Sequence, residues 1–336
     1  MVMKWQDYLK LLQFVSFFLA QIVNSILIVL LVNRTAKRLG NFRHMMVIFA
    51  VYSMLYSFVE FITHPLMHIK VPSFVVFMNG PIKYNKDIGF LVTCLFCACF
   101  ALCISLLAAQ FFFRYTIVCR KDGVAKMENG KFLFLLIPCL LNFIVWYLFV
   151  YFGMDSSNIK REFLSDVIKE NYGDSMKDLA FIAPMYWNPT TDEWRYLDLS
   201  ASLGCVIIVI SCFSTIVYCG VNIHKKMREV STIMSQKTKD MNRQLFVTLV
   251  LQTVLPFFLM YCPVGLLLTF PLINIEAGRL ANVPAATASV YPALEPMIVI
   301  FCIKEFRNSI ISKLNGTSHV SSRVSAAAVS ASNQIH

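Results

Sequence analysis

The sequence is poor in charge. Only 15% of its 336 residues are Asp, Glu, Lys or Arg, against 57% that are hydrophobic, whereas a soluble domain carries about a quarter charged residues. This shortage excludes an ordinary water-soluble globular domain and favours a chain whose main solvent is lipid. The net charge of +11 does not indicate nucleic-acid binding, because the basic residues form short clusters between long apolar runs.

Lysine and arginine are absent from seven apolar runs, each long enough to cross a hydrocarbon core of about 30 Å as a helix. Glu60 and Glu295 are the acidic residues inside these runs. The sequence therefore predicts an all-α membrane protein, a seven-transmembrane helix bundle over residues 11–303. Its spans are expected at about residues 11–32, 45–69, 88–113, 132–152, 199–223, 245–270 and 283–303.

The connections between the spans differ in charge between the two sides of the membrane. One set, formed by residues 33–44, 114–131, 224–244 and the tail from Lys304, holds 19 Lys and Arg and 5 Asp and Glu, whereas the other set holds 11 and 12. Because cytoplasmic connections carry the excess of basic residues, we expect an extracellular N-terminus. An odd number of spans without an internal repeat also disfavours a secondary transporter.

Segments outside the spans have their own expected roles. Residues 1–10 are expected to be a short extracellular N-terminus. Residues 154–198 are too long for a turn, so we expect an extracellular lid loop that begins with an amphipathic helix; a loop that merely covers helix ends is the alternative. Residues 304–315 predict an interfacial amphipathic helix, and the Ser- and Ala-rich residues 316–336 predict a disordered cytoplasmic tail.

Three ionisable residues recur in the second span. Glu60, His64 and His68 are spaced four residues apart, so a continuous helix would place them on one face. Because such groups are costly in lipid, we expect them to face either a ligand or an interhelical hydrogen-bond network. His64 and His68 also have metal-ligand spacing, but the third protein ligand of a zinc site is missing nearby. We therefore expect neither a metal nor a cofactor.

Other candidate ligand contacts are uncharged residues in the outer halves of the spans. Individually each is better explained by packing, but together they describe a small, mostly apolar cavity with few polar anchors, the general form of a small-molecule site. They are Thr93, Cys97, Tyr261, Thr287 and Tyr291. Ten of the eleven cysteines lie in apolar runs, which indicates packing rather than a disulfide framework. A pairing of Cys94 or Cys97 with Cys205 stays open.

The expected cytoplasmic ends of the third, fifth and sixth spans are basic. Such clusters anchor helices to anionic head groups or bind a protein partner. The candidate partner contacts are Arg114, Tyr115, Arg120, Lys225, Lys226, Arg228, Lys239 and Arg243. Prolines near a membrane-embedded carboxyl group indicate either hinges or static kinks. The candidate switch residues are Pro256, Tyr291, Pro292, Glu295 and Pro296.

Six ordered blocks between Asn24 and Leu314 carry a family resemblance. They are LGNFRHMM at 39–46, VEFITHPLMH at 59–68, CACFA at 97–101 leading to Arg114-Tyr115, RQLF at 243–246, LQTVLP at 251–256 and YPALEP at 291–296. In these blocks the chain resembles the nematode seven-transmembrane serpentine chemoreceptors of the Str class.

The resemblance implies a G-protein-coupled-receptor-like bundle that binds a small odorant or soluble chemical and activates a heterotrimeric G protein. It also implies a multi-pass protein of the plasma membrane, at the ciliary membrane of sensory neurons. Arg114-Tyr115 is similar to the end of the Asp-Arg-Tyr motif of rhodopsin-like receptors, with Phe113 in place of the acid. Glu295-Pro296 is similar to the start of their Asn-Pro-x-x-Tyr motif, with Val299 in place of the tyrosine.

Two other classes share the hydropathy pattern. A seven-spanning ligand-gated cation channel of inverted topology is the main alternative, and the basic connections argue against its orientation. An intramembrane hydrolase would need metal ligands or a paired nucleophile and base, and the sequence offers no convincing set. We therefore expect a receptor rather than an enzyme.

Overall fold

The structure is a computed structural model that describes residues 5–33, 39–120, 122–127, 130–230 and 235–314. In this part of the chain, seven helical stretches are long and apolar enough to cross a membrane, which confirms the predicted seven-helix bundle. Residues 1–4 of the predicted N-terminus, residue 315 and the predicted tail 316–336 lie outside the described residues.

The spans follow one another with little interruption. They are α1 (Trp5–Val32), α2 (Phe42–Thr63), α3 (Lys86–Cys119), η2 with α5 (Lys131–Leu135, Leu136–Gly153), α7 (Tyr196–Glu229), α8 with η4, α9 and η5 (Gln236–Pro256, Phe257–Tyr261, Cys262–Thr269, Phe270–Ile273), and η6 with α10 (Arg279–Ala281, Asn282–Cys302). The remaining elements are β1 (Pro65–Lys70), β2 (Ser73–Met78), α4 (Gly123–Met127), α6 (Asn158–Tyr172), β3 (Phe181–Ile182), β4 (Trp187–Asn188), β5 (Glu193–Trp194) and α11 (Lys304–Leu314).

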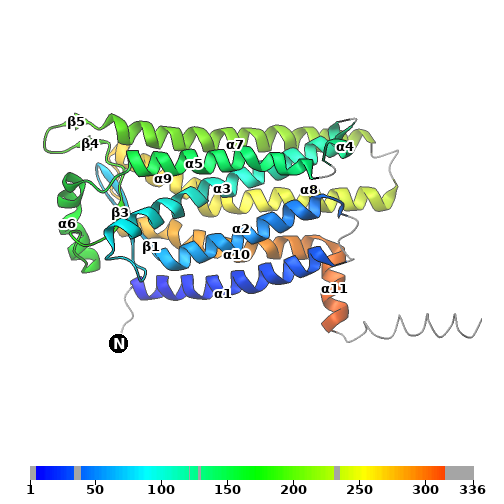
Figure 1. Ribbon diagram of the computed structural model, residues 1–336, viewed down its shortest axis with the longest axis horizontal. Coiled ribbons are helices and arrows are strands. Elements are labelled where there is room, and N and C mark those ends of the chain that lie inside the picture. The colour runs from blue at the N-terminus through cyan, green and yellow to red at the C-terminus, as the bar shows by residue number, and fades with distance from the viewer. Residues whose placement is uncertain (1–4, 34–38, 121, 128–129, 231–234, 315–336) are drawn as a thin grey trace, which may run out of the picture.

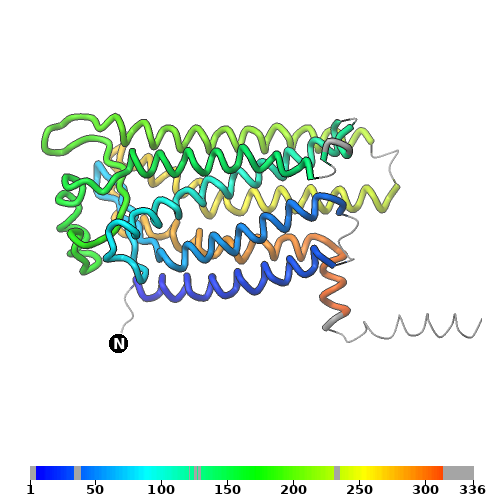
Figure 2. Tube along the Cα trace, viewed as in Figure 1, coloured from blue at the N-terminus to red at the C-terminus, as the bar shows by residue number. Residues whose placement is uncertain are grey.

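The elements outside the spans gather at the two ends of the bundle (Figure 1). Strands β1, β2 and β3 and helix α6 lie at the end where α1 begins, here called the lid end. Helix α11 turns across the axis of α10 at the opposite end, here called the α11 end. The first and last spans, α1 and α10, lie side by side (Figure 2), and a hydrogen bond from Asn24 to the Pro292 carbonyl joins them.

The spans are apolar on all sides because one face packs against other helices and the other faces lipid. In α1 the buried residues Ala20, Leu27 and Leu31 recur at helical spacing. Between them Ile22 and Val29 are more than half exposed. This surface would be unfavourable in water and is suited to a bilayer.

The second span is shorter than predicted, which corrects the expected range 45–69. Helix α2 ends at Thr63, and His64 adopts a left-handed conformation with φ 40° and ψ 61°. Pro65 explains the ending, because the ring of a proline disfavours helical geometry at the preceding residue. Residues 65–70 then form β1 instead of the last turns of a helix.

Four other helices are longer than the spans predicted from hydropathy. Helix α1 begins at Trp5 rather than residue 11, so residues 5–10 of the predicted N-terminus form its first turns. Helix α3 runs to Cys119 rather than residue 113, α7 runs to Glu229 rather than residue 223, and α8 begins at Gln236 rather than residue 245. Hydropathy finds only the part of a helix that crosses lipid. The added turns are rich in Lys, Arg, Met and Gln, which favour helix and are stable in contact with water.

A small sheet separates the bundle from helix α6. Strand β1 pairs antiparallel with β2, and β2 pairs antiparallel with β3, with Val76 opposite Ile182 and Phe77 opposite Phe181. Because successive side chains of a strand point to opposite faces, Phe74, Val76 and Ile182 pack into the bundle core. Their neighbours Val75, Phe77 and Phe181 pack beneath α6 instead. Both faces of the sheet are therefore buried.

Helix α6 is held down by a buried charge cluster. The Lys160 ammonium is fully buried, donates to Asp155 Oδ1 at 2.7 Å and contacts Asp198 Oδ1. Asp198, in the first turn of α7, also accepts from Arg195 Nε at 2.9 Å and from the Met185 amide at 3.1 Å. Each charge in the cluster has an opposite partner, which offsets part of the cost of burial. The cluster joins α6 to the first turn of α7.

Candidate functional site

An apolar cavity lies between the sheet and the spanning helices. Its walls come from α2, α3, α5, α7, α9 and α10, and its roof comes from the strands and the segment after β3. The lining residues are Tyr56, Met67, Phe74, Val76, Phe96, Cys97, Phe100, Trp146, Val150, Met154, Ile182, Pro184, Cys205, Val264, Leu268, Pro284 and Ala288. Residues from the whole length of the chain thus meet at one place.

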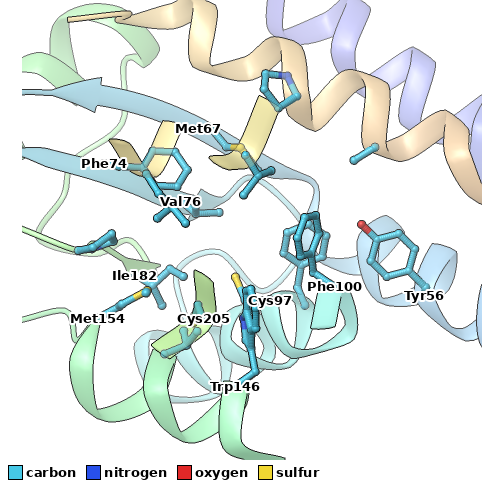
Figure 3. Close-up of a pocket in the computed structure, with 17 residues that line it drawn as sticks. Tyr56, Met67, Phe74, Val76, Cys97, Phe100, Trp146, Met154, Ile182 and Cys205 are labelled. Atoms are coloured by element: carbon cyan, nitrogen blue, oxygen red, sulfur yellow. The ribbon is translucent and has the colours of Figure 1, made fainter. Parts of the chain in front are cut away.

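The strand register produces the roof. Figure 3 shows Met67, Phe74 and Val76 on one side of the cavity, facing Cys97, Trp146 and Cys205 on the other. The strand residues are those that alternation turns toward the bundle. The roof therefore depends on the pairing of β2 with both of its neighbours, because a shift of one residue would turn these side chains toward α6.

The cavity is small and uncharged. Its volume is about 70 Å³. One water molecule needs about 10 to 15 Å³ of such space, so the cavity fits a compact molecule of about five to seven heavy atoms. All seventeen lining residues lie in the described part of the chain, and none of them carries a charge. Such walls favour an uncharged apolar ligand, because an ion would lose its hydration without compensation.

Few polar groups on the cavity wall can orient a ligand. Tyr56 is almost fully buried, and within the described residues its hydroxyl has no hydrogen-bond partner. A buried hydroxyl without a partner is uncommon. It can donate a hydrogen bond to a ligand that carries an acceptor oxygen. The thiols of Cys97 and Cys205 add polarizable surface nearby.

Among the eight predicted ligand contacts, Cys97 is the one that lines this cavity. Thr93 is buried and donates back to the Gly89 carbonyl of its own helix at 2.8 Å. Glu60 is buried in α2, and no partner for its Oε1 occurs within the described residues. The sequence analysis missed the other lining residues because apolar side chains do not stand out in an apolar chain.

The predicted polar face of Glu60, His64 and His68 is wrong, because the three residues do not share a helix. His64 ends α2, with its Nδ1 3.0 Å from Gln13 Oε1 of α1. His68 lies in β1 on the side of the sheet that faces α6, with its Nδ1 3.2 Å from the Tyr172 hydroxyl. Burial, together with the charges of Arg279 and Lys70, lowers the pKa of His68 to about 4.

Thr287 and Tyr261 hold helices together. Thr287 of α10 donates to the carbonyl of Leu259 at 2.6 Å. At α-helical spacing that carbonyl would accept from residue 263, which is a proline without an N–H. Tyr261 donates to the Phe100 carbonyl of α3 at 3.1 Å. Both hydroxyls therefore satisfy backbone groups inside the bundle.

The predicted switch residues are buried in two helices, Pro256 at the end of α8 and Tyr291, Pro292, Glu295 and Pro296 in α10. The side-chain amide of Gln252 in α8 donates to Glu295 in α10, and Cys103 of α3 donates to the Tyr291 hydroxyl at 3.6 Å. After Pro256, the chain continues as a π-helical segment, η4, before α9 begins. Proline and π-helical segments are recognised positions of helix bending. Glu295 thus joins α10 to α8, and Tyr291 joins α10 to α3. Pro256 lies where α8 passes into the segment that leads to α9, and both α9 and α10 line the cavity.

At the α11 end, Arg114 bridges α3 and α8. Its guanidinium is buried, donates to Asn242 Oδ1 at 3.0 Å and lies 5.5 Å from the ring centroid of Phe42. Phe113, which replaces the acid of the related motif, is fully buried against Phe42 and Phe132. Arg114 is therefore hydrogen-bonded to a neutral amide on α8. In the related motif, the acidic residue that precedes the arginine would form an ion pair with it instead.

The other predicted partner contacts are spread over the same end. The Tyr115 ring lies 5.8 Å from that of Tyr218 and beneath Arg120. Lys226 pairs with Glu229 at 3.0 Å. The remaining members are exposed residues of α7 and α8, namely Lys225, Arg228, Lys239 and Arg243.

The described residues contain no group of three or more His, Cys, Asp or Glu that could hold a metal ion. All eleven cysteines have free thiols, so the pairing of Cys94 or Cys97 with Cys205 is not formed.

The arrangement of the helices is that of a rhodopsin-like receptor. Squid rhodopsin superposes with a TM-score of 0.55 at 15% sequence identity, over 93% of this chain and 82% of that protein. At this identity the match shows the fold alone, a bundle of seven helices. The sequence also matches the family model described as serpentine type 7TM GPCR chemoreceptor Str over residues 9–311, so the chain belongs to the Str family.

Nematode receptors are similar over most of their length. Serpentine receptor class r-10 of Caenorhabditis briggsae is 29% identical, with 91% of this chain and 90% of that protein aligned. The protein of the same name from Caenorhabditis elegans is 29% identical, with 88% and 87% aligned. The family is one of multi-pass membrane receptors rather than enzymes.

Proposed function

We propose that the chain is a chemosensory receptor that binds a small uncharged molecule in the cavity and activates a heterotrimeric G protein at the α11 end. The cavity beneath the sheet carries this proposal, because it is apolar, compact and built from six spanning helices. Its size selects compact odorant-like molecules. The Tyr56 hydroxyl favours, among them, molecules with one acceptor oxygen.

A continuous series of contacts supports transmission from the cavity to the α11 end. Pro284 and Ala288 of α10 line the cavity, and the same helix carries Glu295, which contacts Gln252 of α8. Helix α8 in turn reaches Arg114 through Asn242. A ligand that binds one arrangement of α8 and α10 more tightly shifts the population toward it. Movement of α8 away from α3 then releases Arg114 to the partner.

The excess of basic residues at the α11 end supports a cytoplasmic position for that end and an extracellular lid. We also propose that the receptor lies in the plasma membrane, at the ciliary membrane of sensory neurons; membership of a chemoreceptor family supports a sensory role. Antibody labelling of an N-terminal epitope on intact cells tests the orientation. Labelling that requires permeabilised cells would favour the ligand-gated channel of inverted topology instead.

A cavity-filling variant tests the binding site. Cells that express the full chain with a calcium or cyclic-nucleotide reporter are screened with small uncharged volatiles to find an agonist. Ala288→Leu places extra carbon in the cavity and should raise the half-maximal agonist concentration by about tenfold or more. Val283→Phe, five residues away at an exposed position of α10, is the control and should respond normally. Equal responses of wild type and Ala288→Leu would contradict the proposed site.

A further inference from the structure

A second hollow lies on the outer surface of the bundle, between α7 and α8 at the α11 end. It is a groove of about 540 Å³ with Phe111 of α3 at its base. Val217 and Val221 of α7 line one wall and Val250 of α8 lines the other. Between about two fifths and three fifths of each valine is exposed. The groove therefore opens toward lipid rather than toward the cavity described above.

Gly220 makes room for this groove. It lines the groove on α7, and a Cβ at this position would meet Phe111 alone, with its nearest atom 3.4 Å away. The space beside the glycine is thus unfilled by the protein. The Cβ of a substituted residue would meet a side chain and not backbone, so substitution at this position is suited to filling the groove.

Charge is confined to one end of the groove. His224, Lys225 and Arg228 line it where α7 leaves the apolar stretch, and all three are exposed. Lys226, the next residue along, does not line the groove and is paired with Glu229. The groove thus has basic residues at one end and an apolar body.

We propose that this groove binds one anionic phospholipid, with its phosphate at Lys225 and Arg228 and the upper part of an acyl chain between α7 and α8. Basic residues beside an apolar surface match the charge and polarity of such a lipid. The proposed orientation puts the site in the cytoplasmic leaflet, where anionic lipids are enriched. The proposal goes beyond the proposed function, because it assigns two candidate G-protein contacts to lipid.

The bound lipid would act on the position of α8. It lies between α7 and α8, while Asn242 ties the same end of α8 to Arg114 of α3. A chain wedged between α7 and α8 contacts α8 next to that hydrogen bond, because Phe246 of the groove lies one helical turn from Asn242. Occupancy of the groove therefore stabilises one placement of α8 without any contact with the odorant cavity.

Lipid binding is measured on the full chain purified in detergent, by native mass spectrometry with phosphatidylserine and phosphatidylcholine of matched acyl chains. We expect wild type to prefer phosphatidylserine. Lys225→Gln should lower the affinity for phosphatidylserine by about fivefold and leave phosphatidylcholine unchanged, because one basic contact near the head group is lost. Lys226→Gln is the matched control and should keep the wild-type preference. Equal loss in both variants, or no preference in wild type, would overturn the site.

Filling the groove tests its apolar part. Gly220→Leu should abolish the preferred binding of one phosphatidylserine molecule, and Val250→Phe, on the opposite wall, provides a second test if the first variant does not fold. Soluble glycerophosphoserine should not compete with the lipid, and competition at equal concentration would overturn the role of the acyl chain. No odorant or G protein takes part in these measurements. They can therefore fail while the proposed function stands, and the reverse also holds.

Discussion

Asn24 of α1 donates its side-chain amide to the main-chain carbonyl of Pro292 in α10 at 2.9 Å. In a regular helix that carbonyl would accept from the N–H of residue 296, which is a proline. The first span therefore satisfies a backbone group that a proline in the last span leaves unpaired. In the same way, the Thr287 hydroxyl donates a hydrogen bond to the Leu259 carbonyl, four residues before Pro263.

Removal of the Asn24 amide should destabilise the bundle. In Asn24→Ala the buried Pro292 carbonyl loses its partner, at a cost of about 1 to 3 kcal/mol. A thermal-denaturation assay on the purified chain in detergent would show a lower melting temperature. Asn222→Ala is the control, because Asn222 is part-exposed and donates to the Tyr218 carbonyl of its own helix rather than to another span. Unchanged stability in Asn24→Ala would show that another group replaces the amide.

The buried cluster at the lid predicts a large effect of a single substitution. Lys160→Met leaves Asp198 with less compensation for its buried charge, and breaking such a pair costs about 3 to 5 kcal/mol. Limited proteolysis should cut the segment around α6 faster in this variant. Lys169→Met, at an exposed position of the same helix, should behave as wild type. The double variant Lys160→Met/Asp198→Asn should recover part of the protection, because the unpaired charge is gone.

Acid should loosen the lid through His68. Its pKa lies at about 4 in the folded protein, below the ordinary value of 6.5, so protonation favours the unfolded lid. This contribution to stability is complete above about pH 6.5 and is lost as the pH falls toward 4. Hydrogen exchange of β1 and α6 between pH 7 and pH 4.5 measures it. His68→Phe should flatten the pH dependence, and an unchanged slope would assign it to another group.

The hydrogen bond between Arg114 and Asn242 should restrain signalling. Asn242→Ala frees α8 from this contact and should raise agonist-independent activity of the G-protein reporter. Arg114→Ala should weaken agonist-induced signalling while ligand binding stays largely intact. Lys237→Ala, at an exposed position of α8 outside the predicted partner contacts, is the control for charge loss at this end. Full G-protein activation by Arg114→Ala would contradict the coupling role of the arginine.

The helices were predictable because lipid imposes a simple rule. A span needs about twenty apolar residues and no Lys or Arg, and this rule predicted all seven helices. It could not predict the hairpin at residues 65–78, because its residues are as apolar as the spans. The evidence for the hairpin was local: Pro65 stops the helix, and Val71-Pro72 separates two short runs of which the second, SFVVFM, is rich in β-branched and aromatic residues.

The cavity was less predictable than the fold. Polarity pointed to residues such as Thr287, Tyr261 and Glu60, yet the two hydroxyls are consumed by backbone carbonyls. The residues that line the cavity are mostly Phe, Met, Val and Ala, which are indistinguishable in sequence from lipid-facing residues. Cavity-lining and lipid-facing residues differ only through the register of the strands and the rotation of each helix about its axis. Sequence periodicity predicts neither the register nor the rotation to within one residue.

The sheet above the cavity has a consequence for timing. On the route through the lid end, the proposed ligand must part strands joined by main-chain hydrogen bonds, or displace Pro184, whose carbonyl accepts from the Phe74 amide at 3.1 Å. The same opening is needed for departure, and such loop motions take microseconds or longer. Entry and escape then slow together while equilibrium affinity is unaffected. A receptor whose proposed binding cavity lies beneath such a sheet would therefore respond to the ligand concentration averaged over time. It would be insensitive to brief fluctuations in that concentration.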